Sequence, residues 1–280
     1  MKQCKDLKIV AVEHPNEGYV LLKLTDNNPL PEIIAGQFVE IKVENSPQTF
    51  LRRPISVNFV DEARNELWLL IQIVGEGTRH LASLQVGDTL NVLFPLGNGF
   101  TKGTAGEQVL LVGGGVGIAP LLEYAKQLKH VGATPYLLLG GRSAHNLLQL
   151  DLFRQYGEVY VTTEDGSMGE KGFVTNSSLL NISLTLPQGE GTVNQSLETH
   201  LLGRGRGRFQ RISCCGPKPM MVAVAKWAKE HQVRCEVSLE NLMACGLGAC
   251  LCCVEKTVKG NVCVCKEGPV FDINELTWQL

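Results

Sequence analysis

The stretch Leu110–Leu122, LLVGGGVGIAPLL, joins an apolar run to a glycine-rich loop and to the start of a helix. The loop consists of Gly113, Gly114, Gly115, Val116 and Gly117. Glycines at such a position let backbone N–H groups approach a pyrophosphate, and the end of a helix adds a positive partial charge. Tight turns also need glycine, so the loop by itself is weak evidence. The stretch predicts a strand, a nucleotide-binding loop and a helix, in this order.

The residues around this loop alternate between short apolar runs and helical patterns. Strands are expected at 108–112 and 136–139, and helices at 120–130 and 146–155. This alternation predicts a parallel sheet covered by helices. The second strand ends in LGGRS (139–143), which lacks the acidic residue that would bind a ribose 2′-hydroxyl, so NAD and NADP both remain open.

A further strand, loop and helix follow at ISCCGPKPMMVAVAKW (212–227). Cys215, Gly216 and Pro217 fall at the carboxyl end of the expected strand, where open α/β sheets bind their ligands. A cysteine in such a place is otherwise a small, buried packing residue. The segment therefore adds to the nucleotide site only in combination with the glycine loop.

The first hundred residues show a different pattern, in which short strand-like runs alternate with turn sequences. Val39, Ile41 and Val43 alternate with polar residues, and 67–74 is another apolar run. Several short strands at this spacing predict a small closed or nearly closed antiparallel β-barrel. The expected fold is therefore an N-terminal barrel followed by a Rossmann-like parallel α/β sheet.

Two segments of the expected barrel have the features of an anion site. FLRRPISV (50–57) places Arg52 and Arg53 in an apolar run, where a guanidinium needs an anion such as phosphate. An ion pair with a surface carboxylate is the alternative. GEGTRHL (75–81) predicts a second backbone cradle for an anion at the start of a short helix. Two such segments in one barrel favour a dinucleotide flavin.

Composition argues against several classes of partner. The chain has 280 residues and a formal net charge of −2, which gives no overall attraction to nucleic acid or to an anionic membrane. The RGRGR sequence within 186–208 is expected to lie in an exposed loop with solvated arginines, with contact to RNA phosphates as the alternative. The first residues lack the apolar core of a signal peptide, which predicts a reducing, cytoplasmic setting.

Six of the ten cysteines lie within ACGLGACLCCVEKTVKGNVCVC (244–265). In a reducing setting, clustered cysteines bind metals or carry redox chemistry more often than they form disulfides. Cys245, Cys250 and Cys253 have the spacing of plant-type [2Fe–2S] sites, and glycines between them let N–H groups approach the sulfides. A structural zinc site is the alternative, although such sites are usually built from paired C-x2-C knuckles.

The motifs RRPIS, GEGT, GGGVGIAP and CCGPKPM, in this order, resemble the ferredoxin–NADP reductase superfamily. The tail LENLMACGLGACLCCVE, followed by VCKEGPVFD, is similar to the electron-transfer subunits of class 1B dihydroorotate dehydrogenases of bacteria. This resemblance implies three domains. They are an FAD-binding barrel over 1–101, a nicotinamide-nucleotide domain over 102–232 and a small C-terminal [2Fe–2S] domain over 233–280.

The resemblance also implies roles for particular residues. The FAD contacts that it implies are Arg53, Pro54, Ile55, Ser56, Leu70, Ile71, Gln72, Gly77 and Thr78. The nicotinamide nucleotide is expected on Gly113–Gly117 with Cys215, Gly216 and Pro217. The iron ligands that it implies are Cys245, Cys250, Cys253 and Cys265. Cys252 and Cys263 are then spare and are expected to point away from the iron, and no residue is assigned as a catalytic acid or base.

The activity implied by the resemblance is an electron relay. NAD(H) exchanges a hydride with FAD, and electrons pass singly through the cluster to an FMN on a partner catalytic subunit, in a complex with two copies of each subunit. That partner interconverts dihydroorotate and orotate in pyrimidine biosynthesis. Related subunits of a sulfide dehydrogenase, a hydrogenase or an NADH-dependent ferredoxin oxidoreductase are the neighbouring interpretation. A zinc-stapled binding module without redox activity is the interpretation from another class.

Overall fold

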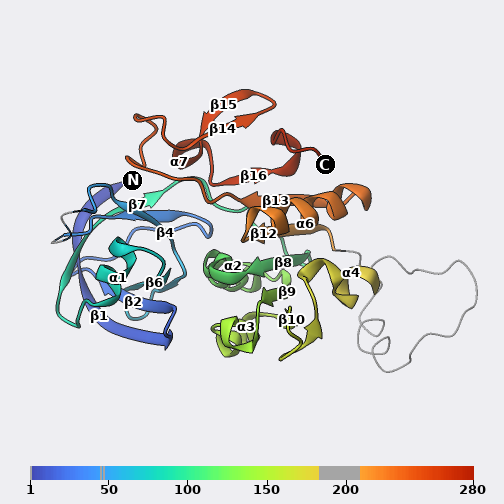
Figure 1. Ribbon diagram of the computed structural model, residues 1–280, viewed down its shortest axis with the longest axis horizontal. Coiled ribbons are helices and arrows are strands. Elements are labelled where there is room, and N and C mark those ends of the chain that lie inside the picture. Colours follow the sequence, from blue (N-terminus) through green and yellow to red (C-terminus); the bar gives the residue numbers. More distant parts are fainter. Residues whose placement is uncertain (1, 45, 47, 183–208) are drawn as a thin grey trace, which may run out of the picture.

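The structure is a computed structural model that describes residues 2–44, 46, 48–182 and 209–280. The expected exposed loop at 186–208, with its RGRGR sequence, lies outside the described residues. Figure 1 shows a curled sheet at the N-terminal end, a second sheet between helices, and a small C-terminal region lying across both.

The N-terminal sheet has seven antiparallel strands in the order β4-β3-β7-β1-β2-β6-β5. Their bounds are β1 Gln3–Asn16, β2 Tyr19–Thr25, β3 Phe38–Ile41, β4 Arg53–Ser56, β5 Phe59–Asp61, β6 Glu66–Gln72 and β7 Thr89–Leu96. The sheet curls until edge strand β4 contacts β6, and a short helix, α1 (Glu76–Ala82), follows β6. The predicted nearly closed barrel is confirmed.

Alternation along β3 decides which side chains enter the barrel. Val39 and Ile41 are fully buried in its aliphatic core, as the pattern predicts. Phe38 and Glu40 point to the other face because side chains of a strand alternate, and Phe38 packs in the core shared with the C-terminal region. The outer face of β3 is therefore covered by protein rather than by solvent.

The second sheet has seven strands in the order β11-β10-β9-β8-β12-β13-β16. Their bounds are β8 Gln108–Gly114, β9 Thr134–Gly141, β10 Glu158–Thr163, β11 Glu170–Lys171, β12 Arg211–Cys215, β13 Arg234–Ser238 and β16 Val270–Asp272. All neighbours are parallel except β16, which pairs antiparallel to β13. The predicted parallel sheet is confirmed, with one antiparallel edge strand from the C-terminal region.

Helices cover both faces of this sheet. The side chains of Val109 and Leu111 pack on the face covered by α2 (Ala119–His130) and α3 (Leu150–Tyr156). Those of Leu110 and Val112 pack on the opposite face, against α6 (Lys218–Glu230) and the short α4 (Ser178–Ile182). Burial on both faces explains why β8 is a continuous apolar run rather than an alternating one.

The predicted bounds of the second helix, 146–155, are wrong. A 3-10 turn covers Ala144–Asn146, and α3 starts only at Leu150, because Gln149 has a left-handed backbone with φ of 57°. The Gln149 amide exchanges two hydrogen bonds with the amide of Asn58 from the barrel, of 2.9 and 3.0 Å. A contact between distant segments therefore interrupts the helical pattern.

The C-terminal region contains a hairpin, β14 (Val254–Thr257) and β15 (Gly260–Cys263), and the short helix α7 (Val264–Glu267). It rests on the barrel at Asn98, whose backbone N–H donates to the carbonyl of Gly268 (2.6 Å) and whose side-chain amide donates to the carbonyl of Glu267 (2.9 Å). A Cβ atom on Gly97 would lie 2.6 Å from Pro269 Cδ. The two backbones are thus in direct contact.

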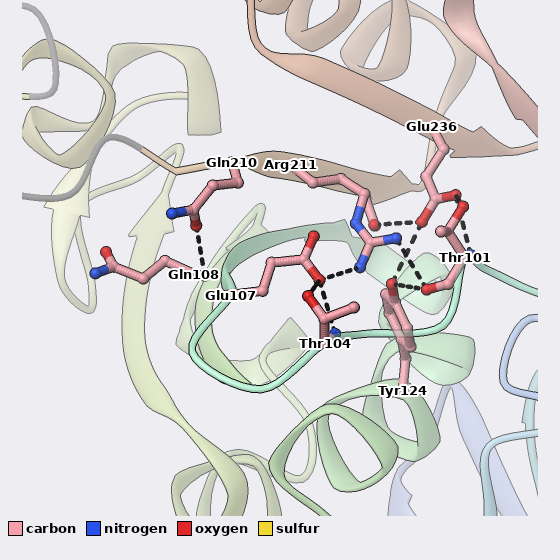
Figure 2. A network of polar contacts seen from close by, with 9 residues as sticks. Thr101, Thr104, Glu107, Gln108, Tyr124, Gln210, Arg211 and Glu236 are labelled. Atoms are coloured by element: carbon pink, nitrogen blue, oxygen red, sulfur yellow. Dashed lines mark hydrogen bonds and ion pairs between the residues drawn. The ribbon is translucent and has the colours of Figure 1, made fainter. Parts of the chain in front are cut away.

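A buried polar network holds the barrel end against the second sheet (Figure 2). The carboxylate of Glu236 accepts hydrogen bonds from the N–H (3.1 Å) and hydroxyl (2.8 Å) of Thr101. The carbonyl of Thr101 accepts from the Tyr124 hydroxyl (2.7 Å) and from Arg211 (2.9 Å). Arg211 also pairs with Glu107 at 3.2 Å. These directional contacts fix the orientation of the two domains.

Candidate functional site

Two segments that are distant in the sequence meet at one end of the barrel. A Cβ atom on Gly77, in the first turn of α1, would lie 3.1 Å from Nε of Arg53 and 3.1 Å from Cγ2 of Thr49. The Thr78 hydroxyl accepts hydrogen bonds from the N–H groups of Val74 (2.9 Å) and Gly75 (3.0 Å), and so holds the turn. The guanidinium and the glycine turn therefore form a single cradle.

The two neighbouring arginines have different surroundings. Arg52 donates to the backbone carbonyls of Glu40 (3.1 Å) and Asn91 (3.2 Å), which ties it to the barrel. Arg53 donates to the carbonyl of Leu51 at 2.8 Å. Within the described part of the chain, neither arginine forms an ion pair with a carboxylate. A cation beside a glycine turn fits the phosphates of a dinucleotide flavin.

The other expected flavin contacts lie on β4 and β6. Pro54, Ile55 and Ser56 are half-buried on β4, which is an edge strand with one side of its backbone unpaired in the sheet. Leu70 and Ile71 are buried and offer a ligand almost no surface, whereas Gln72 is exposed.

The two predicted nucleotide loops touch each other. A Cβ atom on Gly117 would lie 2.5 Å from the carbonyl oxygen of Cys215 and 2.5 Å from the backbone nitrogen of Gly216. Gly113 and Gly114 belong to the end of β8, and Gly115 has a φ of +57° at the start of a 3-10 turn, Gly115–Ile118. The loops form one surface at the carboxyl ends of β8 and β12, where such sheets bind nucleotides.

Cys215 lies at this surface but its side chain is buried. Burial raises the pKa of the Cys215 thiol well above its ordinary value, and the nearby Glu240 carboxylate raises it further. The thiol therefore stays protonated. Glu240 follows β13. Surrounding protein atoms partly desolvate its carboxylate and so raise its pKa, although the residue is still exposed to solvent. Sequence analysis missed Glu240, because a single glutamate after a strand gives no signal.

The four expected iron ligands gather around one loop. The N–H of Leu247 points to Sγ of Cys245 (3.3 Å), and the N–H of Cys265 points to Sγ of Cys253 (3.4 Å). Gly248 donates its N–H to Sγ of Cys265 at 3.1 Å. Such N–H groups stabilise thiolates, which is what an iron–sulfur cluster requires of its loop.

The protonation of Cys245 reflects this loop. Desolvation acts to raise its pKa, but hydrogen bonds from the N–H groups of Leu247 and Cys250 outweigh it and lower the pKa to about 6. Gly246 and Gly248 have φ of +65° and +79°, which only glycine adopts without strain. Among the described residues, no three His, Cys, Asp or Glu side chains are arranged to hold a single metal ion.

The two spare cysteines differ from each other. Cys252 is exposed and Cys263 is half-buried. The Cys263 thiol lies 3.7 Å from the carbonyl oxygen of Gly248, and its pKa is raised by burial and by Cys253, Cys250 and Cys245. Cys263 therefore lies beside the loop that carries the proposed ligands.

A buried glutamate lies beneath the cysteine loop. A Cβ atom on Gly246 would be 2.8 Å from Cγ of Glu40 and 2.8 Å from Cδ1 of Leu96. Glu40 is fully buried, and neither carboxylate oxygen has a hydrogen-bond partner among the described residues. Burial raises the pKa of Glu40 to about 7, against the opposing charge of Arg52. Because Glu40 is paired with Pro54 of β4, it lies between the flavin side and the cysteine loop.

Comparison with known proteins agrees with this arrangement. Residues 240–277 match the model of the iron–sulfur cluster binding domain of dihydroorotate dehydrogenase B. A curated protein from Fusobacterium nucleatum, named dihydroorotate dehydrogenase B (NAD(+)), electron transfer subunit, is 38% identical over 84% of each chain. One of the same name from Streptococcus pneumoniae is 36% identical over 97% of each chain.

Solved structures share the fold. A structure of an NADH-dependent reduced ferredoxin–NADP oxidoreductase has a TM-score of 0.80 and 28% identity, and the match covers 97% of this chain and 90% of that one. A ferredoxin–NADP reductase from Neisseria gonorrhoeae has a TM-score of 0.61 and 20% identity, over 81% and 91% of the two chains. The fold and the sites thus define a flavin-dependent reductase with an added iron–sulfur region.

The chain belongs to the family of dihydroorotate dehydrogenase B electron transfer subunits. It is an oxidoreductase subunit whose cofactors are FAD, a [2Fe–2S] cluster and NAD(H), and it works with a catalytic partner subunit. No helix in the described ranges is both long and apolar enough to span a membrane.

Gly246→Ala is predicted to impair the cysteine loop. The added Cβ would meet Glu40 and Leu96 at 2.8 Å and would strain a backbone at φ of +65°. We expect lower iron and acid-labile sulfide per chain, with FAD retained. Gly260→Ala is the matched control, because its φ is +107° but nothing lies within 4 Å of the added Cβ. Equal iron in the two variants would show that the close contact is unimportant.

Glu40→Gln is predicted to stabilise the protein in a pH-dependent manner. The folded-state pKa of about 7 exceeds the ordinary 4.5, so the ionised carboxylate is disfavoured in the folded protein. Wild type should lose stability as pH rises from 4.5 to 7, by at most about 3 kcal/mol, while glutamine stays neutral. Thermal midpoints at pH 5 and 8.5 measure the difference. Exposed Glu44→Gln is the control, and an advantage of Glu40→Gln that does not grow with pH contradicts the assignment.

Proposed function

We propose that this chain carries electrons between NAD(H) and a separate FMN-containing catalytic subunit that interconverts dihydroorotate and orotate. The observation that supports this proposal most directly is the contact of Gly246 with Glu40 and Leu96, which brings the cysteine loop directly onto the barrel. When bound, FAD exchanges electron pairs with a nicotinamide and single electrons with an iron–sulfur cluster. This chain's residues must therefore hold three groups close together and keep water out.

On the flavin side, Arg53 neutralises a phosphate, while Gly77 and Thr78 form the turn that receives the pyrophosphate. Support comes from the contact between Arg53 and Gly77 and from the lack of a carboxylate partner for Arg53 among the described residues. Ser56 donates its hydroxyl to a ring nitrogen of the flavin. Pro54 and Ile55 line the same edge strand, and the segment Leu70–Gln72 lines the flavin from β6.

On the nucleotide side, Gly113–Gly117 and the segment Cys215–Pro217 bind the nicotinamide nucleotide, and Val116 belongs to this loop. The contact between Gly117 and Cys215 supports a shared surface. Cys215 stays a neutral thiol and fills space beside the nicotinamide, and Glu240 lies next to it. The curated relatives carry NAD(+) in their names, which favours NAD over NADP.

In the C-terminal region, Cys245, Cys250, Cys253 and Cys265 are the iron ligands. This assignment is supported by the backbone N–H groups that point to the sulfurs of three of these cysteines. We keep the division into 1–101, 102–232 and 233–280 as a proposal. Strand β13 lies in the second sheet and so connects the last two of these parts.

The partner subunit docks on the face formed by the cysteine loop. Leu242, Leu247 and Leu251 are 85%, 50% and 64% exposed around the ligands, and such apolar exposure is typical of interaction surfaces. Docking there places the partner's cofactor next to the loop from which electrons leave. The complex contains two copies of each subunit and is cytoplasmic.

A pull-down of the full chain from its native host tests this function. We expect a co-purifying FMN protein and reduction of NAD+ by dihydroorotate in the complex. The likeness to the NADH-dependent reduced ferredoxin–NADP oxidoreductase supports a second candidate, a subunit that exchanges electrons with ferredoxin. Co-purification of a larger flavin and iron–sulfur subunit, without dihydroorotate oxidation, would support the ferredoxin-linked function instead.

Arg53→Ala is predicted to remove most of the FAD from the purified protein, because Arg53 supplies the positive charge at the phosphate cradle. Arg79→Ala is the matched control, since Arg79 is exposed on the same short helix, α1. Flavin absorbance per chain is the measurement. Full FAD occupancy in Arg53→Ala would refute the assignment of this residue.

Cys250→Ser is predicted to remove the cluster and to keep the flavin. Cys250 is exposed on the ligand loop, away from the barrel cradle, so NADH should still bleach the flavin absorbance at the wild-type rate. Electron delivery to the partner should be lost. Iron and sulfide contents equal to those of wild type would contradict the ligand assignment.

A further inference from the structure

Cys263 ends strand β15, two residues before Cys265. Its thiol lies 3.7 Å from the carbonyl oxygen of Gly248, and the N–H of Gly248 lies 3.1 Å from Sγ of Cys265. The two thiols therefore contact opposite ends of the same residue in the ligand loop.

The side chain of Cys263 also packs against Gly248, because a Cβ atom on Gly248 would lie 3.9 Å from Cβ of Cys263. Cys263 is half-buried, whereas Cys265 is buried. Cys263 therefore lies beside the same loop residue that donates its N–H to Cys265.

We infer that Cys263 is a second ligand for the fourth position of the cluster, which binds iron when Cys265 does not. This inference rests on the proposed ligand set. The exchange breaks one iron–thiolate bond and forms another, Cys263 gives up a proton and Cys265 takes one up, and no electron is transferred. The Cys263 thiol already contacts Gly248, the residue that donates its N–H to Cys265, so the exchange requires only a local movement of the loop.

The test compares full-length chains purified without oxygen. Alanine at position 265 has no oxygen or sulfur that could bind iron, so in Cys265→Ala the thiol of Cys263 is tested as the replacement. The double variant Cys263→Ala/Cys265→Ala lacks both thiols. Cys263→Ala and Cys252→Ala are the matched controls. Iron, acid-labile sulfide and FAD are measured per chain, together with the electron paramagnetic resonance spectrum after reduction with dithionite.

We expect Cys265→Ala to keep most of its iron and sulfide with a shifted spectrum, and the double variant to lose them while keeping FAD. Both controls should resemble wild type. Loss of the cluster from Cys265→Ala with FAD retained overturns the inference, as does equal iron in the single and double variants. Cys265→Ser is measured in parallel, so that a folding failure of the alanine variant, seen as loss of FAD, does not decide the result.

The two levels of the proposal fail in different ways. Wild type without iron and sulfide would reject the proposed function itself. A cluster that is intact in wild type and missing from Cys263→Ala would make Cys263 the resident ligand, which overturns its role as the second one.

Discussion

The structure depends on the close approach of the Gly246 backbone to two side chains of the barrel. With no Cβ and a φ of +65°, this residue lets the cysteine loop lie directly on Glu40 and Leu96 of the barrel. Gly97 does the same on the barrel side, against Pro269. The C-terminal region is also held by the pairing of β16 with β13. It therefore touches the flavin-binding and nucleotide-binding parts together, which is what a path for electrons out of the flavin requires.

Two polar junctions keep those parts in one orientation. At one side, the buried side chains of Glu236 and Arg211 bond to Thr101, and hydrogen bonds of buried groups are directional and costly to leave unmade. At the other side, Asn58 donates to the carbonyl of Ala119 (3.0 Å) and pairs with Gln149. Asn58 is two residues beyond Ser56, and Ala119 is two beyond Gly117. This junction therefore sets the flavin-binding strand against the nucleotide loop.

Much of this architecture is predictable from local sequence. The glycine loop after an apolar strand, the arginines of RRPIS and the cysteine spacing each carry their chemistry within a few residues. The missed features depend on contacts between distant segments. Glu40 alternates with apolar residues like any solvent-facing strand residue, and only the C-terminal region that covers it makes it buried. The start of α3 depends on Asn58, and the placement of Cys263 depends on how the hairpin returns to Gly248.

The central claim is that cysteines of the C-terminal region hold two irons close enough to the flavin for electrons to leave one at a time. The most direct measurement is electron paramagnetic resonance of protein prepared without oxygen and reduced with NADH alone. The account predicts the signal of a reduced [2Fe–2S] cluster, with two irons and two acid-labile sulfides per chain. Protein that contains FAD but gives no signal and no acid-labile sulfide would contradict it.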